Sequence, residues 1–321
     1  MANQDDVAKQ QASIQSRQDQ RDGSMQKEQQ EQPVQTGARQ PAPPMPEQHL
    51  VKPGLEAQMD LKPRFMAEHY KGSGKLQGQV AIVTGGDSGI GRAVAVLFAR
   101  EGADVAILYL NEHEDAAETR RCVEAEGQRC LTVPGDVKDM EFCQEAVDKI
   151  VAEWGRMDVL VNNAAFQEHA SDITDLSEDR FDETFRTNIY GYFHMAKACI
   201  PYMKRGGAII NTGSVTGLKG SKKLLDYSAT KGAIHAFTMS LAANLIDKGI
   251  RVNCVAPGPV WTPLNPADQS PDKIKEFGAG TTYKRPAQPE ELSPAYVFLA
   301  SSACSSYITG VILPVTGTVG E

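Results

Sequence analysis

The sequence predicts an α/β fold in which helices are wound on both faces of a parallel sheet. Short runs rich in β-branched residues alternate with longer stretches of helical periodicity. The short runs are almost continuously apolar, which is typical of strands buried on both faces. Strands and helices in this order are joined by right-handed crossovers, so the sequence predicts a doubly wound sheet.

Composition favours some classes of partner and disfavours others. The chain has 321 residues, 41% of them hydrophobic, which is enough for a sizeable core. Its formal net charge of -8 disfavours nucleic acid and anionic membranes. Six cysteines occur without a CxxC pair or a His-Cys cluster, which predicts reduced thiols and no metal site. With no signal-like N-terminus and no run of about 18 apolar residues, we expect a soluble cytoplasmic protein.

Two segments precede the predicted domain. Residues 1–45 are rich in glutamine and in charges of both signs, so they are expected to form a disordered tail. Residues 46–78 carry isolated apolar residues separated by prolines, which favours an extended arm packed on the domain surface. The remaining residues, 79–321, are expected to form a single domain.

The alternation of strands and helices begins at residue 80. Apolar runs predict strands at 80–83, 104–109, 130–133, 157–161, 208–210, 250–255 and 311–315. The first helix is predicted from apolar residues at helical spacing, Ile90, Ala93, Val94, Leu97 and Phe98. A longer helical pattern runs from about residue 178 to Lys204-Arg205, with Gly206-Gly207 as its stop.

A glycine-rich turn joins the first strand to the first helix. It contains Gly85, Asp87, Ser88, Gly89, Ile90 and Gly91. Glycines allow the backbone to approach a pyrophosphate closely, and the N-terminus of the helix attracts its negative charge. Because a strand precedes the turn and a helix follows it, we expect a dinucleotide site rather than a structural turn without a ligand.

A second candidate site consists of Tyr227 and Lys231, which are spaced i, i+4 on one face of a predicted helix. At an effective dielectric of about 20 and a separation of about 5 Å, the ammonium would stabilise the phenolate by roughly 3 kcal/mol. This predicts a phenol pKa about two units below its usual value, suited to proton exchange with an alcohol or carbonyl. Because this spacing is common, the pair alone is more typical of an ordinary amphipathic helix, so its meaning depends on the neighbouring motifs.

These motifs together resemble the short-chain dehydrogenase/reductase family. The spacing of Gly85, Gly89 and Gly91 is similar to that family's cofactor turn, and Ser214 stands 13 positions before Tyr227, as the resemblance requires. Further matches follow in the expected order over roughly residues 79–319: Asp136-Val137, Asn162-Asn163-Ala164-Ala165, Asn188, Pro257-Gly258-Pro259-Val260-Trp261-Thr262 and Ile308-Thr309-Gly310. In one departure, Ala165 replaces the last glycine of the family's Asn-Asn-Ala-Gly segment.

The resemblance implies a Rossmann-fold enzyme with a nicotinamide cofactor, commonly a homotetramer. It implies that Tyr227 is the acid/base, that Lys231 lowers the phenol pKa and binds the nicotinamide ribose, and that Ser214 orients the substrate oxygen. Asn188 would hold a water of a proton relay. The implied cofactor contacts are Gly85, Asp87, Ser88, Gly89, Ile90, Gly91, Tyr109, Leu110, Asp136, Val137, Asn163, Ala164, Tyr227, Lys231, Pro257, Gly258, Val260 and Thr262.

The choice of nicotinamide cofactor depends on the end of the second strand. NAD-dependent enzymes usually place an acidic residue there, whereas NADP-dependent enzymes supply a cation for the 2′-phosphate. Tyr109-Leu110-Asn111 has neither, and acidic residues that would repel the phosphate follow at once: Glu112, Glu114 and Asp115. The nearest cations, Arg120 and Arg121, are expected to face solvent. The sequence therefore favours NAD, with NADP possible.

The sequence thus predicts hydride transfer between nicotinamide and a carbonyl compound or secondary alcohol, such as a sugar, a polyol or a small aldehyde or ketone. The segment Tyr70-Lys71-Gly72-Ser73-Gly74-Lys75-Leu76 further resembles a bacterial branch of the family labelled glucose and ribitol dehydrogenase homologues. Two alternatives stay open: an NADP-dependent ketoacyl or xenobiotic carbonyl reductase, and a cofactor-binding sensor or stress protein with incidental catalysis. Residues 261–285 are expected to form a lid over the site.

Overall fold

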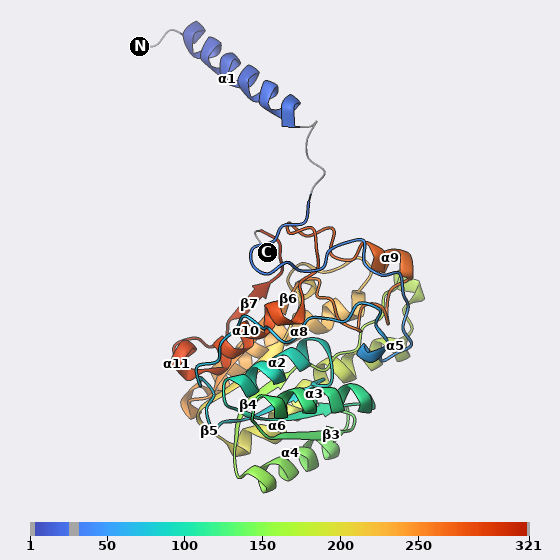
Figure 1. The fold of residues 1–321 in the computed structure, drawn as a ribbon, viewed down its shortest axis with the longest axis vertical. Coiled ribbons are helices and arrows are strands. Elements are labelled where there is room, and N and C mark those ends of the chain that lie inside the picture. Colours follow the sequence, from blue (N-terminus) through green and yellow to red (C-terminus); the bar gives the residue numbers. More distant parts are fainter. Residues whose placement is uncertain (1–3, 26–31, 320–321) are drawn as a thin grey trace.

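The computed structural model describes residues 4–25 and 32–319, and a seven-stranded parallel sheet forms its centre (Figure 1). The strand order is β3-β2-β1-β4-β5-β6-β7. The strands are β1 (Val80–Thr84), β2 (Asp104–Tyr109), β3 (Cys130–Pro134), β4 (Met157–Asn162), β5 (Met203–Thr212), β6 (Arg251–Pro257) and β7 (Ile312–Val315). The predicted doubly wound α/β fold is confirmed.

Helices cover both faces of the sheet. The longer helices of the domain are α2 (Gly89–Arg100), α3 (His113–Ala125), α4 (Met140–Trp154), α5 (Glu178–Phe185), α6 (Gly191–Cys199), α8 (Leu225–Leu245) and α10 (Pro289–Ala300). The short ones are η1 (Glu56–Gln58), η2 (Ile173–Asp175), η3 (Arg186–Tyr190), η4 (Ile200–Tyr202), α7 (Thr216–Lys219), η5 (Ile246–Lys248), α9 (Pro271–Lys275) and α11 (Ser302–Ser305).

Alternate residues of the central strand β1 enter different cores. Ala81 and Val83 pack with α2, α3 and α10 on one face, whereas Val80 and Ile82 pack with α4, α6 and α8 on the other. All of β1 is therefore buried, which explains why it is a continuous apolar run in the sequence. This two-sided burial fixes the carboxyl end of β1, from which the glycine-rich turn leaves the sheet.

The predicted helix from residue 178 to Lys204-Arg205 is wrong in its last part. The helical region ends with α6 and the short η4, and β5 begins at Met203, where it pairs with Met157 of β4. Pro201 lies in η4 and cannot donate the backbone hydrogen bond that a continuing α-helix needs. The helical pattern therefore stops before the glycines that were expected to end it.

The expected disordered tail, residues 1–45, differs from the structure over α1 (Gln4–Met25), which is helical. Residues 9–20 contain no glycine or proline, and most are glutamine, alanine, lysine or arginine, which have high helix propensity. Arg17 also donates a hydrogen bond to Ser13 one turn earlier. The side chains of residues 9–20 are exposed, so local propensity rather than packing accounts for this helix. Residues 1–3 and 26–31 of the expected tail lie outside the described residues.

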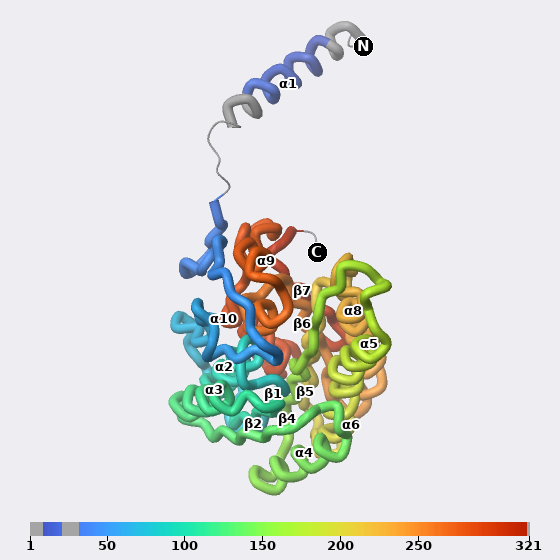
Figure 2. The backbone as a smooth tube through the Cα atoms, turned by 90° about the vertical axis from the view of Figure 1, so that its right-hand side faces the viewer, coloured from blue at the N-terminus to red at the C-terminus, as the bar shows by residue number. Residues whose placement is uncertain are grey.

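An arm runs over the surface of the domain before β1. It comprises residues 32–78 and is therefore longer than the predicted arm, because the Val34 N–H already donates to the Tyr283 carbonyl at 2.9 Å. In Figure 2 the blue arm passes beside the orange segment that carries α9. A small core joins the two, consisting of Met45, Leu50, Met59, Trp261, Ala267 and Ile274.

The described helices include none that is both long enough and apolar enough to cross a membrane. The six cysteines are free, and only Cys304 is exposed.

Candidate active site

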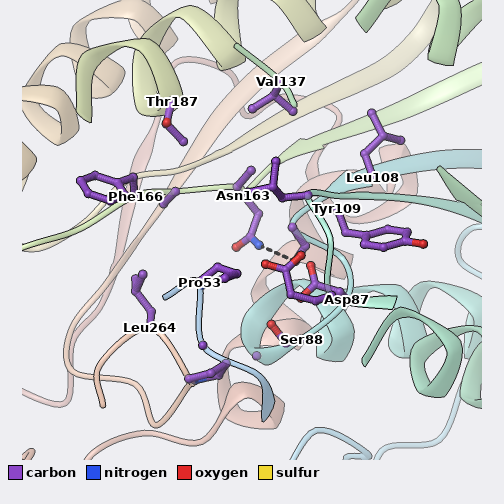
Figure 3. Close-up of a pocket in the computed structure, with 18 of the residues that line it drawn as sticks. Pro53, Asp87, Ser88, Leu108, Tyr109, Val137, Asn163, Phe166, Thr187 and Leu264 are labelled. Carbon is purple, nitrogen blue, oxygen red and sulfur yellow. Dashed lines mark hydrogen bonds between the residues drawn. The ribbon is translucent and has the colours of Figure 1, made fainter. Parts of the chain in front are cut away.

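A cleft lies at the carboxyl ends of the central strands, where the strand order changes direction between β1 and β4 (Figure 3). Ligands of doubly wound sheets bind at such a switch point. Figure 3 shows Pro53 of the arm and Leu264 on one side of the cleft, with Asp87 and Tyr109 on the other. The wall therefore comes from the sheet, from the arm and from the segment after β6.

The glycine-rich turn forms a cradle that side chains would fill. Gly85 has φ +60°, and a Cβ at this position would lie 3.1 Å from the Ala164 Cα atom. A Cβ at Gly91 would lie only 1.9 Å from the Gly85 carbonyl oxygen, and one at Gly89 would lie 2.9 Å from Thr262 Cγ2. Since α2 begins in this cradle, the positive end of its dipole lies beside the cleft, while the N–H of its first residue, Gly89, donates to Glu56. The residues present therefore fit the diphosphate of a dinucleotide.

Most of the predicted cofactor contacts lie around the cleft. The part next to the turn is lined by Gly85, Asp87, Ser88, Gly89, Ile90, Tyr109, Leu110, Asp136, Val137, Asn163, Ala164 and Thr262. A second pocket is lined by Ser214, Tyr227, Lys231, Pro257, Gly258, Val260 and Thr262. The two pockets share Ile90, Asn163, Ala165, Thr262 and Leu264, so they form one continuous cleft. Of the predicted site residues, Gly91 and Asn188 line neither pocket.

The predicted catalytic side chains come from two neighbouring elements. Helix α8 carries Tyr227 and Lys231, and Ser214 follows the end of β5. The Lys231 ammonium donates a hydrogen bond to the Thr212 carbonyl at 2.8 Å and lies 5.3 Å from the centre of the Tyr227 ring. All three side chains are buried and line the second pocket.

The predicted lowering of the Tyr227 pKa is wrong for this structure. Burial raises the pKa of the Tyr227 phenol well above its usual range, and a hydrogen bond with Ser214 offsets only part of this. Burial also lowers the pKa of Lys231, to about 8. Helical spacing predicts only the effect of the neighbouring charge, whereas desolvation acts on both groups and has the larger effect. Tyr227 therefore keeps its proton at neutral pH.

Asn188 is fully buried in the middle of η3, a π-helical segment between α5 and α6. Its side-chain oxygen accepts from the Phe166 N–H at 2.8 Å, and its nitrogen donates to the Phe166 carbonyl and to Thr230 Oγ1, each at 3.0 Å. The amide thus has partners at both its oxygen and its nitrogen, and the relay water that the resemblance implies for Asn188 stays a prediction. In the structure Asn188 positions the loop after β4 against α8.

A carboxylate fastens the predicted lid to the loop after β4. Asp268 accepts hydrogen bonds from the backbone and ring of His169, at 2.8 and 2.7 Å, and from Gln167 Nε2 at 2.7 Å. Glu168, His169 and Asp268 also bring one potential metal ligand each within 4.8 Å of one another. Both carboxylate oxygens of Asp268 already accept hydrogen bonds, which fits a fastening of the lid. Asn265 and Gln269 of the same segment line the second pocket.

Acidic residues surround the end of the cleft nearest β2. Asp87 and Glu112 line the cleft beside Leu110. Burial and the charge of Glu112 raise the pKa of Asp87 to about 7. Asp115 instead accepts hydrogen bonds from the backbone of the arm. The two arginines of α3 form ion pairs on its outer side, Arg120 with Glu124 and Arg121 with Glu118.

The sequence analysis missed several residues of the cleft. Pro53 and Gly54 of the arm line it, and so do Phe166 and Leu264. Gln167 and Gln269 line the second pocket. None of them lies in a motif, and the arm residues are brought to the cleft by contacts far apart in the sequence. The prolines of the arm predicted its extended conformation, but they did not indicate that the arm contacts the cleft.

Comparison with known proteins adds independent findings. A family model described as enoyl-(acyl carrier protein) reductase matches residues 85–318. An NADPH-dependent aldehyde reductase from Arabidopsis thaliana is 49% identical over 273 residues, which are 83% of this chain and 95% of the relative. A glucose and ribitol dehydrogenase from Daucus carota is 48% identical over 278 residues, 85% of this chain and 95% of the relative.

A solved structure is also similar. The crystal structure of a short chain dehydrogenase from Burkholderia cenocepacia in complex with NADP matches with a TM-score of 0.72 at 31% identity, covering 77% of this chain and 100% of that one. Two of these proteins are described with their cofactor: NADPH for the Arabidopsis reductase and NADP for the Burkholderia dehydrogenase. The sequence-based preference for NAD finds no support in these comparisons.

Proposed function

The chain belongs to the short-chain dehydrogenase/reductase family and is a nicotinamide-dependent oxidoreductase, and we propose that it reduces the carbonyl group of small hydroxylated aldehydes. One observation carries the proposal. Ser214, Tyr227 and Lys231 are buried together in a pocket that is continuous with the dinucleotide cleft and that also contains amide side chains.

The proposed mechanism runs in the direction of reduction. A nicotinamide held in the cleft would supply the hydride. Tyr227, which keeps its proton because burial raises its pKa, donates that proton to the carbonyl oxygen. The Ser214 hydroxyl orients the same oxygen by a hydrogen bond. The Lys231 ammonium stabilises the phenolate that remains, because it lies 5.3 Å from the Tyr227 ring in a buried site.

The lining of the second pocket supports a substrate with hydroxyl groups. Gln167, Asn265 and Gln269 bring amides to a wall that also contains Leu224 and Phe277. Amides can hydrogen-bond hydroxyl groups, whereas a purely apolar wall would favour aliphatic chains. Sugars and polyols are the corresponding substrates and products. The descriptions of the two plant relatives, an aldehyde reductase and a glucose and ribitol dehydrogenase, agree with this class.

We propose NADP(H) as the cofactor, because the Arabidopsis reductase is described as NADPH-dependent and the Burkholderia dehydrogenase is in complex with NADP. The acidic wall near Leu110 opposes a 2′-phosphate, but Asp87 has a pKa of about 7 and is therefore about half protonated at neutral pH. A protonated Asp87 can donate a hydrogen bond to a phosphate oxygen instead of repelling it. Affinity for NADPH should then rise as the pH falls through 7.

The oligomeric state and the compartment also remain proposals. We propose a homo-oligomer, supported by the exposed aromatic side chains of Phe181, Tyr190 and Phe193 along α5, η3 and α6. Light scattering that gives the mass of a monomer would contradict it. A cytoplasmic location is supported by the six free cysteines.

Replacement of the phenol tests the catalytic proposal. Tyr227→Phe should lose about 100-fold or more in turnover while keeping its affinity for NADPH, because only the proton donor is removed. Tyr192→Phe is the matched control: it removes a buried hydroxyl that donates to the Thr212 carbonyl at 3.1 Å, outside the pocket lining, and should keep most turnover. Near-normal turnover of Tyr227→Phe would contradict the proposed mechanism.

The substrate class is tested with a matched pair of three-carbon aldehydes. Glyceraldehyde and propanal differ in hydroxyl groups and share the reacting carbonyl. Consumption of NADPH should give a higher kcat/KM for glyceraldehyde, because the amides of the pocket can bind its hydroxyl groups. A preference for propanal would favour the alternative of a xenobiotic carbonyl reductase. Cofactor binding without reduction of any carbonyl compound would favour the sensor alternative.

A further inference from the structure

The arm connects both edges of the cofactor cleft. On the side of the segment after β6, the Met45 and Leu50 N–H groups donate to the carbonyls of Lys275 and Pro266, at 2.8 and 2.9 Å. On the side of β4, Lys52 Nζ donates to the Gln167 carbonyl at 2.7 Å and pairs with Glu168 at 3.1 Å. Pro53 and Gly54, which line the cleft, lie between these contacts and η1.

Glu56 of η1 enters the protein directly behind the glycine-rich turn. Its side chain is 2% exposed, and one carboxylate oxygen accepts from the Gly89 N–H, the first residue of α2, at 2.7 Å. The other oxygen pairs with Arg92 Nη1 at 2.5 Å. Neither Glu56 nor Arg92 is among the described residues that line the cleft, so Glu56 contacts the turn from the side away from the ligand.

Arg92 extends the contact to the other side of the turn. Its Nε and Nη2 atoms both donate to the Asp87 carbonyl, at 3.0 and 2.7 Å. Glu56 therefore holds Gly89 directly and Asp87 through Arg92, and both of these residues line the cleft. Charge-assisted hydrogen bonds of this kind fix backbone geometry more strongly than neutral ones.

The position of Glu56 is itself fixed by α3. Asp115 accepts from the N–H groups of Glu56 and Ala57, at 2.6 and 2.9 Å. Gly54 adds a contact with the segment after β6: it has φ +96°, and a Cβ there would lie 2.9 Å from the Pro263 carbonyl oxygen. The arm thus reaches the turn with a defined geometry from α3 and from the opposite edge of the cleft.

We infer that Glu56 is a positioning residue of the cofactor-binding turn, delivered by the arm, and that the arm forms a third wall of the cofactor site. The inference rests on the proposed use of a nicotinamide cofactor. It assigns to Glu56 the task of holding Asp87 to Gly89 in the shape that receives the diphosphate. Removal of its charge should weaken cofactor binding without altering the catalytic groups, which lie in the second pocket.

The test compares two arm variants of the full chain that act at opposite ends of α2. Glu56→Gln removes the charge at the N-terminal end. Tyr70→Phe removes the hydrogen bond from Tyr70 to Glu101 at the C-terminal end, next to no residue of the cleft lining. The dissociation constant for NADPH is measured by calorimetric titration, and kcat and KM are measured with the aldehyde substrate.

Glu56→Gln should raise the dissociation constant and the KM for NADPH about tenfold, the effect of one charged hydrogen bond, while kcat at saturating NADPH stays within about twofold. Tyr70→Phe should leave the dissociation constant within about twofold even if both variants melt at lower temperature. An unchanged dissociation constant in Glu56→Gln, or an equal rise in both variants, would overturn the inference.

Three further outcomes complete the test, and the last two separate the inference from the proposed function. If Glu56→Gln yields no folded protein, Asp115→Asn decides, because it loosens η1 and leaves Glu56 charged: weaker NADPH binding supports the inference, and unchanged binding overturns it. If the unaltered protein binds NADPH but reduces no carbonyl compound, the proposed substrate class is wrong. The dissociation constants for NADPH still test the role of Glu56 in that case. If it binds neither NADPH nor NADH, both ideas fail.

Discussion

Replacing Lys231 by methionine should abolish turnover and yet stabilise the protein at neutral pH. Lys231 is 1% exposed, and burial lowers its pKa from 10.5 to about 8. The native state therefore holds the ammonium less favourably than the unfolded state does. A methionine of similar length has no charge to desolvate and can occupy the same space.

The size of the effect follows from the pKa. Lowering the Lys231 pKa from 10.5 to about 8 corresponds to a cost of about 3 kcal/mol at pH 7, where both states carry the proton. Lys231→Met also loses the hydrogen bond to the Thr212 carbonyl, which destabilises the variant by about 1 kcal/mol. The loss is modest because that carbonyl still accepts a hydrogen bond from the Tyr192 hydroxyl. We expect Lys231→Met to be more stable by about 2 kcal/mol at pH 7.

The sign of the pH dependence provides a sharper check. The native pKa lies below the unfolded one, so between about pH 8 and 10.5 the unfolded state binds more protons and the unaltered protein gains stability as pH rises. The advantage of Lys231→Met should therefore shrink by about 2 kcal/mol between pH 7 and pH 10. Below pH 8 the advantage should be constant.

Urea unfolding at both pH values, at one protein concentration, measures these differences. The exposed Lys222→Met is the matched control for exchange of a lysine for methionine outside the buried site. The reasoning is refuted if Lys231→Met is less stable than the unaltered protein at pH 7. It is equally refuted if the gap between them is the same at pH 7 and pH 10.

Two further predictions concern carboxylates of the site. Asp87→Asn should make the dissociation constant for NADPH independent of pH between about 7 and 8, where the 2′-phosphate is already ionised, whereas the unaltered protein should bind more weakly above its Asp87 pKa of about 7; titrations without a pH effect in the unaltered protein would contradict this. Burial would raise the pKa of Asp268, but hydrogen bonds from His169 and Gln167 lower it below its usual value. Asp268→Asn should therefore cost about 1–3 kcal/mol in urea unfolding at pH 7, and this cost should begin to fall below about pH 4 and vanish once the pH is below the lowered native pKa of Asp268. A cost that persists in acid would contradict the second prediction.

The sheet could be predicted because strands that are buried on both faces are continuous apolar runs in the sequence. Strand β2 was predicted with its observed bounds, whereas β5 starts at Met203, before its apolar run. The difference arises because Met203 pairs with Met157 across a register irregularity, a contact that local periodicity does not encode. Helix α1 was missed because low hydrophobicity was taken as absence of structure, although its residues have high helix propensity.

The sequence predicts which residues form the site better than it predicts their pKa values. The motif residues lie at the ends of parallel strands, and the fold brings such ends together. The direction of the Tyr227 pKa depends on burial, which spacing along a helix does not reveal. The contact between Glu56 and Arg92 joins residues 36 positions apart with no shared pattern, so the role of the arm emerges only in three dimensions.

The small core between the arm and the segment after β6 has a spectroscopic consequence. Trp261 is fully buried there, and its indole N–H donates to the Leu61 carbonyl of the arm at 2.8 Å. The other tryptophan, Trp154, lies far along the chain on α4 beside Arg129. In a Trp154→Phe background, emission comes from Trp261 alone and should shift to the red whenever the arm lifts. The emission of Trp261 thus reports whether the arm is attached, and it can be followed in real time during cofactor exchange.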